Sequence, residues 1–132
     1  MVRNLQKINQ YIIDNKGRPF EWSEFDCCTM ACDIVVIQGG DDFAKDVRGT
    51  YSNEIGAKRA LKTHFGTVEE AFSSLTEIDF NFVQRGDLVL FDVDGEKAMT
   101  FRFGEGYYCI SRQFGGLGVL ADSSKPLKAW RV

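Results

Sequence analysis

The spacing of apolar residues changes once along this chain, near Gly86, and this change constrains the fold more than any other feature. Before Gly86, apolar residues recur at the spacing of one helix face. After it, they alternate within short segments that are separated by glycine-containing turns. Helices followed by a run of short strands are typical of an α+β fold with an antiparallel sheet.

Four helices are expected in the first part of the chain. They cover residues 4–15, 27–38 and about 53–64, with a fourth that begins at Thr67. Asp26 stands at the N-cap position of the second helix, where its side chain can bind free backbone N–H groups. Thr67 and Glu70 have the spacing of a capping box. The expected apolar face of the fourth helix consists of Val68, Ala71, Phe72 and Leu75.

About five strands are expected after Gly86. They cover residues 87–93, 99–103, 107–111, 117–121 and 127–132. The sequence therefore predicts an α+β fold in which N-terminal helices pack on a small, curled antiparallel sheet. With 132 residues, 44% of them hydrophobic, the chain can fill one core but not two, so we expect a single domain over residues 1–132.

Charge and hydropathy make several classes of partner and location unexpected. The net charge is −3, and Lys and Arg are scattered among acidic residues instead of forming a basic stripe. We therefore expect no nucleic-acid partner and no binding to an anionic membrane surface. No segment approaches the roughly 18 to 20 apolar residues of a membrane span. The N-terminus also lacks the apolar core of an export signal, so the cysteines are expected to stay reduced in the compartment of synthesis.

Cys27 is the candidate for chemistry because it lies in the first turn of a predicted helix. Free N–H groups and the positive end of the helix dipole stabilise a thiolate there, and they can also hold an oxyanion. The carboxylate of Asp26 opposes this, unless capping engages it. Cys28 and Cys32 are expected to be buried apolar side chains of the same helix.

Metal and cofactor chemistry are not expected. Cys27, Cys28, Cys32 and His64 could imitate a zinc-binding set, but no Cys-x-x-Cys spacing occurs, and Cys27 points away from the helix face that Cys28 and Cys32 share. Redox chemistry of the Cys-x-x-Cys type lacks the same spacing. We predict no metal and no cofactor.

Several short motifs resemble known proteins. Trp22, Asp26 and Cys27 are similar to the aromatic-Trp and Asp-Cys signature at the nucleophile of NlpC/P60 cysteine peptidases. Residues 84–91 resemble the Pro-Gly-Asp-Leu-Val-Phe-Phe segment that opens the sheet of those enzymes. Further motifs resemble uncharacterised phage and prophage proteins that are similar to the NlpC/P60 branch of tail-tip modules: Asp26-Cys27-Cys28, Asp33, Gly39, Arg48-Gly49-Thr50-Tyr51, Gly56-Ala57 and Ala129-Trp130-Arg131-Val132. The resemblance covers residues 19–132 and implies a papain-like fold.

The resemblance also implies that the catalytic base is missing. NlpC/P60 enzymes use a His that opens the second strand of the sheet, and Ala98 stands at the matching position here. His64 lies far from that strand in the sequence and suits a structural role at a helix C-terminus. Two further departures are Ser23-Glu24, where the enzymes usually carry glycines, and the third polar residue of the triad, for which 111–113 offer no clear counterpart.

Three functions follow as hypotheses. The favoured one is a structural or assembly protein of a phage tail tip on a peptidase-like fold, without catalytic activity, located in the virion after synthesis in the bacterial host cytoplasm. Its partners would be other tail-tip or hub proteins. The second is a peptidoglycan hydrolase with Cys27 as nucleophile and an unorthodox base. The third is a module that binds a peptide or glycan in an open groove lined by Trp22, Phe25 and aromatic residues of the sheet.

Four residues are candidates for binding. Trp22 and Asp26 belong to the signature around Cys27, whereas Arg48 and Tyr51 belong to the Arg-Gly-Thr-Tyr motif. Arg and Tyr are common anchors of interfaces. The alternative, which we favour for Arg48, is an internal ion pair with Asp33 or Asp46.

Overall fold

The computed structural model describes residues 4–121 and 124–132. Residues 1–3, which belong to the segment considered above as an export signal, lie outside the described part. The helices are α1 (Leu5–Asn15), α2 (Cys27–Ile37), α3 (Glu54–His64) and the short α4 (Val68–Ala71), with a 3-10 turn η1 (Phe80–Phe82). The strands are β1 (Thr76–Ile78), β2 (Leu88–Val93), β3 (Glu96–Phe103), β4 (Gly106–Ser111), β5 (Gly116–Val119) and β6 (Lys125–Arg131).

The sheet is antiparallel and open, with the strand order β1-β6-β2-β3-β4-β5. The predicted α+β class is confirmed, but the sheet has six strands, one more than expected. The additional strand is β1, which pairs with the end of β6. Its three residues are too few to show an alternating pattern in the sequence.

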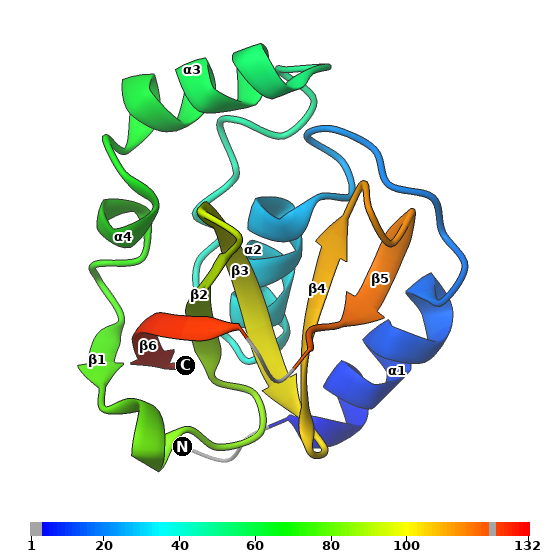
Figure 1. Cartoon of the computed structure of the whole chain (residues 1–132), viewed down its shortest axis with the longest axis vertical. Helices are drawn as coiled ribbons and strands as arrows, with labels where there is room; N and C mark the ends of the chain where they lie inside the picture. The colour runs from blue at the N-terminus through cyan, green and yellow to red at the C-terminus, as the bar shows by residue number, and fades with distance from the viewer. Residues whose placement is uncertain (1–3, 122–123) are drawn as a thin grey trace.

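Apolar side chains cover both faces of the sheet. Side chains from α1 and α2 pack on one face against Leu88, Leu90, Met99 and Phe101. In Figure 1, α2 lies behind β3 and β4, and α1 lies at the lower right, below β5. Phe91 and its neighbours form a smaller cluster on the other face. Because β2 supplies side chains to both clusters, its residues 88–91 are all buried.

The fourth predicted helix is shorter than expected. The side-chain oxygen of Thr67 accepts a hydrogen bond from the N–H of Glu70 at 3.1 Å, so the helix begins where the capping box predicts. It ends after four residues, because the chain turns at 72–75 to enter β1. Phe72 is nevertheless 1% exposed and packs against Trp130 at 5.8 Å between ring centres. Phe72, from the predicted apolar face, is thus buried in the core although the helix ends before it.

The helices α2 and α3 are packed very differently. The central helix α2 buries six of its eleven residues, whereas α3 has the same length and buries none. Figure 1 shows α3 at the top of the molecule, apart from the sheet. Within the described residues, no helix is both long and apolar enough to cross a membrane.

Candidate functional site

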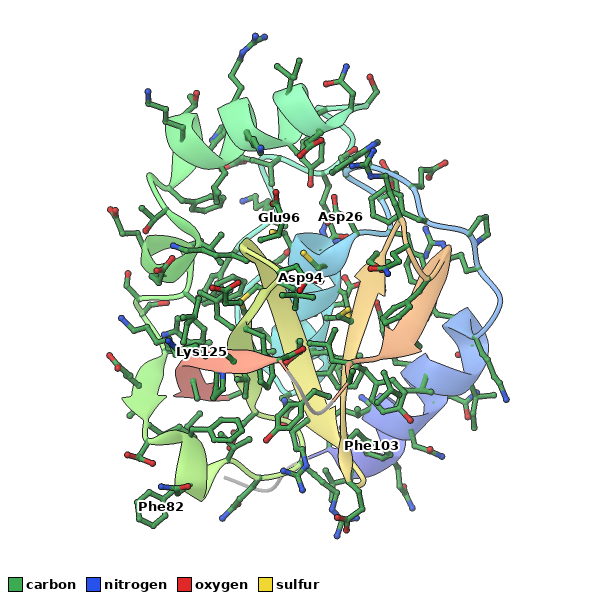
Figure 2. All side chains as sticks on the ribbon, viewed as in Figure 1. Asp26, Phe82, Asp94, Glu96, Phe103 and Lys125 are labelled. Atoms are coloured by element: carbon green, nitrogen blue, oxygen red, sulfur yellow. The ribbon has the colours of Figure 1, made fainter. Side chains whose placement is uncertain are left out.

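Asp26 organises the start of α2, as the sequence predicts. One carboxylate oxygen, Oδ1, accepts the backbone N–H of Thr29 at 2.9 Å and its hydroxyl at 3.1 Å. The other oxygen, Oδ2, accepts the backbone N–H of Ser23 at 2.9 Å and the hydroxyl of Tyr51 at 2.5 Å. These contacts engage both oxygens of the Asp26 carboxylate. Figure 2 labels Asp26 at this end of α2.

The segment before Asp26 forms a tight turn whose backbone suits glycine. Glu21 and Phe25 form an isolated antiparallel bridge, and the N–H of Phe25 donates to the carbonyl of Glu21 at 2.8 Å. Between them, Ser23 has a φ of 64°, in the left-handed region that glycine adopts most easily. Ser23 therefore has a backbone conformation that favours glycine, although the residue is Ser.

Cys27 is half-buried at the first position of α2. Its pKa lies below the ordinary value for a thiol, chiefly because the Cys28 thiol donates a hydrogen bond to it. A hydrogen bond with the backbone of Met99 on β3 lowers the pKa further, while burial and the charge of Asp26 raise it. Hydrogen bonds from the Cys28 thiol and the Met99 backbone therefore favour a thiolate at Cys27, and the neighbouring Asp26 carboxylate weakens this preference without removing it.

The other three thiols remain protonated at neutral pH. The hydrogen bond to Cys27 and burial raise the pKa of Cys28 well above its ordinary value. Burial raises the pKa of Cys32 to about 12 and that of Cys109 to about 12. Both of these side chains are buried, which confirms the expectation for Cys32, whereas Cys28, which was also expected to be buried, is half-buried. Cys27 is thus the one thiol among the four that is prepared for reaction.

The strand that faces Cys27 presents Met99, not Ala98. Ala98 pairs with Phe91, whereas Met99 pairs with Leu90. Directly opposed residues share one face of a sheet, so Ala98 lies on the face of Phe91, away from α2. Met99 lies on the helix side, and its backbone is the part of β3 that reaches Cys27. Neither Ala98 nor Met99 has a titratable side chain.

His64 does not serve Cys27 in this structure. It is the last residue of α3, its side chain is exposed, and its nearest ring partner is Phe65 at 6.2 Å between ring centres. Among the described residues, no hydrogen bond joins His64 to Cys27. The sequence argument for a structural position at the end of a helix agrees with this placement.

Trp22 and Tyr51 stand beside the cysteine helix. Their rings contact at 6.4 Å between centres, and Phe20 packs on the other side of Trp22 at 4.9 Å. Burial and the nearby Asp26 carboxylate raise the pKa of Tyr51, so its hydroxyl stays protonated and donates to that carboxylate. Phe25 is 1% exposed and lies in the core. Phe25 therefore does not line the open groove that the ligand-binding hypothesis required.

Arg48 has an internal role. Its guanidinium binds Asp33 at 2.7 Å and Asp42 at 3.0 Å. Tyr11 also donates to Asp33 at 3.0 Å, so this network joins α1, α2 and the loop that follows α2. The predicted partner Asp33 is correct, and the predicted partner Asp46 is wrong. Asp42 replaces it because the backbone turn at 42–45 brings the Asp42 carboxylate toward the guanidinium.

The arrangement favours a thiolate at Cys27, which is the form in which a cysteine attacks a carbonyl. Cys27 has a helix start that favours thiolate, whereas the groups that influence its pKa include no imidazole. Within the described ranges, no group of three or more His, Cys, Asp or Glu side chains is arranged to hold a metal ion.

Fold and site together define an α+β protein with a half-buried cysteine at the capped start of its central helix. Over residues 3–132, the chain matches the family "Domain of unknown function (DUF6950)", and the protein belongs to this family. No curated protein matches the chain.

Proposed function

We propose that this protein is a structural or assembly component of a phage tail tip, built on an NlpC/P60-like fold whose site no longer cuts peptide bonds. The observation that carries the proposal is the composition of the strand opposite Cys27. There, Met99 is 1% exposed and pairs with Leu90, so an apolar residue occupies the side from which a base would act.

A cysteine peptidase needs a group that takes the thiol proton and returns it to the leaving amine. Asp26 is the nearest carboxylate along the chain, and four hydrogen bonds engage its two oxygens. Tyr51 holds its own proton, for the reasons given above. A thiolate alone can attack a carbonyl, but an amine leaves poorly without a proton. These observations support the proposal of a structural role over that of a peptidase.

The tail assignment rests on the ordered motifs that resemble phage and prophage tail-tip proteins across residues 19–132. A fold can outlast its chemistry, since packing and site residues are constrained separately. Its partners would then be other tail-tip or hub proteins.

The test is whether virions contain the protein and need it. Mass spectrometry of purified phage particles should detect it at a fixed ratio to the major tail protein. Deletion of its gene should leave particles with incomplete tails, and supply of the Cys27→Ala protein should restore them. Tails that assemble normally without the protein, in virions that lack it, would contradict the proposal.

A second candidate function is a cysteine hydrolase that acts on peptidoglycan peptides, and the lowered pKa of Cys27 favours it. In that case, Cys27→Ala would abolish the release of peptide fragments from purified cell walls, and His64→Ala would decide whether the exposed histidine moves in to act as base. Equal release by wild type and Cys27→Ala would dismiss this candidate.

A further inference from the structure

Arg112 connects three segments at the outer side of the cysteine helix. It lies in the turn between β4 and β5, and its guanidinium carbon is 5.3 Å from the centre of the Trp22 ring. Its Nη2 atom lies 3.4 Å from Oε2 of Glu54, at the start of α3. Trp22 in turn contacts Tyr51, whose hydroxyl binds Asp26. Arg112 is therefore the outer end of a chain of contacts that leads to the residue before Cys27.

The contact between Arg112 and Glu54 is weak. The two side chains are 62% and 45% exposed, and charge-assisted bonds of this kind are usually nearer 2.7–2.9 Å. Glu54 is also shared with Lys58 at 3.3 Å. Arg48 gives the contrast, because two carboxylates hold its guanidinium at 2.7 and 3.0 Å. The Arg112 guanidinium thus lies over the Trp22 ring, and within residues 4–121 and 124–132 its one carboxylate partner is Glu54, at 3.4 Å.

Exposed apolar side chains flank this pair in the sequence. Phe114 follows in the same turn and is 43% exposed, and Ile55 follows Glu54 and is 70% exposed. Arg and aromatic residues together are typical of the anchors of protein interfaces. We propose that Arg112, with Trp22 and Phe114, docks an acidic and apolar segment of a partner protein, whose Asp or Glu carboxylate replaces Glu54 on the guanidinium. This proposal rests on the proposed assembly role, since it names the chemistry of the partner.

The experiment is a titration of the isotope-labelled protein with a short end-blocked peptide of Glu, Leu and Gly. The NMR signals of the Arg112 Nε–H and the Trp22 indole N–H are followed. We expect both signals to shift and saturate with this peptide. A matched peptide with Gln in place of Glu should bind about tenfold more weakly or not at all, because the charge-assisted bond is lost. Equal binding of the Gln peptide would overturn the proposal.

Three variants sharpen the result. Arg112→Ala should weaken binding about tenfold, whereas Arg102→Ala should leave it unchanged. Arg102 is the matched control because it also lies over an aromatic ring, Tyr107, at 5.2 Å. Glu54→Gln removes the internal competitor and should tighten binding about threefold. An equal loss in Arg102→Ala, or weaker binding by Glu54→Gln, would overturn the proposal.

Two further outcomes separate the alternatives. If acetate at the same carboxylate concentration produces the same shifts and saturation, the site takes free carboxylates and the peptide proposal is overturned. If no peptide binds but the protein is still found in virions and is needed for tails, the docking proposal fails while the assembly role stands. If the Glu peptide binds but the protein is absent from virions, the docking proposal stands and the proposed role in tail assembly fails.

Discussion

The start of α2 and the facing part of β3 form the two halves of one site, and they differ in what the fold requires of them. On α2, Asp26 caps the helix, fixes the turn through Ser23 and receives the Tyr51 hydroxyl. On β3, Met99 fills the core and contributes one backbone contact to Cys27.

The two halves also act differently on Cys27. The hydrogen bonds that lower its pKa come chiefly from the Cys28 thiol and then from the backbone of Met99 on β3, whereas Asp26, which caps the helix, raises it. A catalytic base on β3 would serve chemistry only, because an apolar side chain packs that side of the sheet equally well. The following experiments test this asymmetry.

The largest effect is expected on the helix side. Asp26→Ala should lower the free energy of unfolding by about 3 kcal/mol, because it removes an N-cap and leaves the buried partners of the carboxylate unpaired. Urea unfolding followed by circular dichroism measures the change. Asn53→Ala is the matched control, since Asn53 caps the exposed α3 through the N–H of Gly56, and it should cost about 1 kcal/mol or less. Equal losses would mean that the two helix starts are equivalent.

The second effect concerns the reactivity of the thiols. Alkylation of the folded protein across pH 5 to 10, about the range in which thiols titrate, should modify Cys27 at least about 100-fold faster than Cys32 and Cys109 at neutral pH. The reason is that the Cys27 pKa is lowered, whereas those of the two buried thiols lie about 12. The Cys27 rate should rise and level off below the pH expected for an ordinary thiol. Mass spectrometry of peptides measures each site, and a uniform rate for all thiols would remove the special status of Cys27.

The third effect tests the hydrogen bond from Cys28. Cys28→Ala removes the main group that lowers the Cys27 pKa, so the midpoint of Cys27 alkylation should move to higher pH. The rate at neutral pH should fall, because a smaller fraction of Cys27 is then thiolate. Cys109→Ala is the control and should leave the midpoint in place or shift it slightly downward. An unchanged midpoint in Cys28→Ala would assign the low pKa to the helix start alone.

The smallest effect is expected on β3. Met99→Leu preserves volume and the backbone contact, so it should cost less than about 1.5 kcal/mol and leave Cys27 alkylation unchanged. The same urea and alkylation measurements apply. A marked fall in Cys27 reactivity would show that the Met99 side chain takes part in the chemistry, contrary to the division of the site described here.

Local signals in the sequence were sufficient for the helix half of the site. Asp26 followed by a buried apolar run predicts a capped helix, and Cys27 then falls at its first position without further information. The strand half depends on register. Only the pairing of Leu90 with Met99 determines which residue of β3 faces α2, and this pairing cannot be read from a short motif.

Longer-range contacts lie further beyond sequence reasoning. The contact between Glu54 and Arg112 joins residues that are 58 positions apart, through exposed side chains with no apolar period to reveal them. The strand β1 is similar, since its three residues gain their structure from β6 and not from their own pattern. The change in apolar spacing near Gly86 was enough to predict the α+β class, because the fold class depends on many residues at once.

The most direct test of the central claim is the release of peptide fragments from purified peptidoglycan, compared between wild type and Cys27→Ala. The claim that the site retains a thiolate but lacks proton transfer predicts the same background release from both proteins, although Cys27 of the wild type alkylates rapidly. Release by wild type that disappears in Cys27→Ala would contradict the claim and establish an active hydrolase with an unrecognised base.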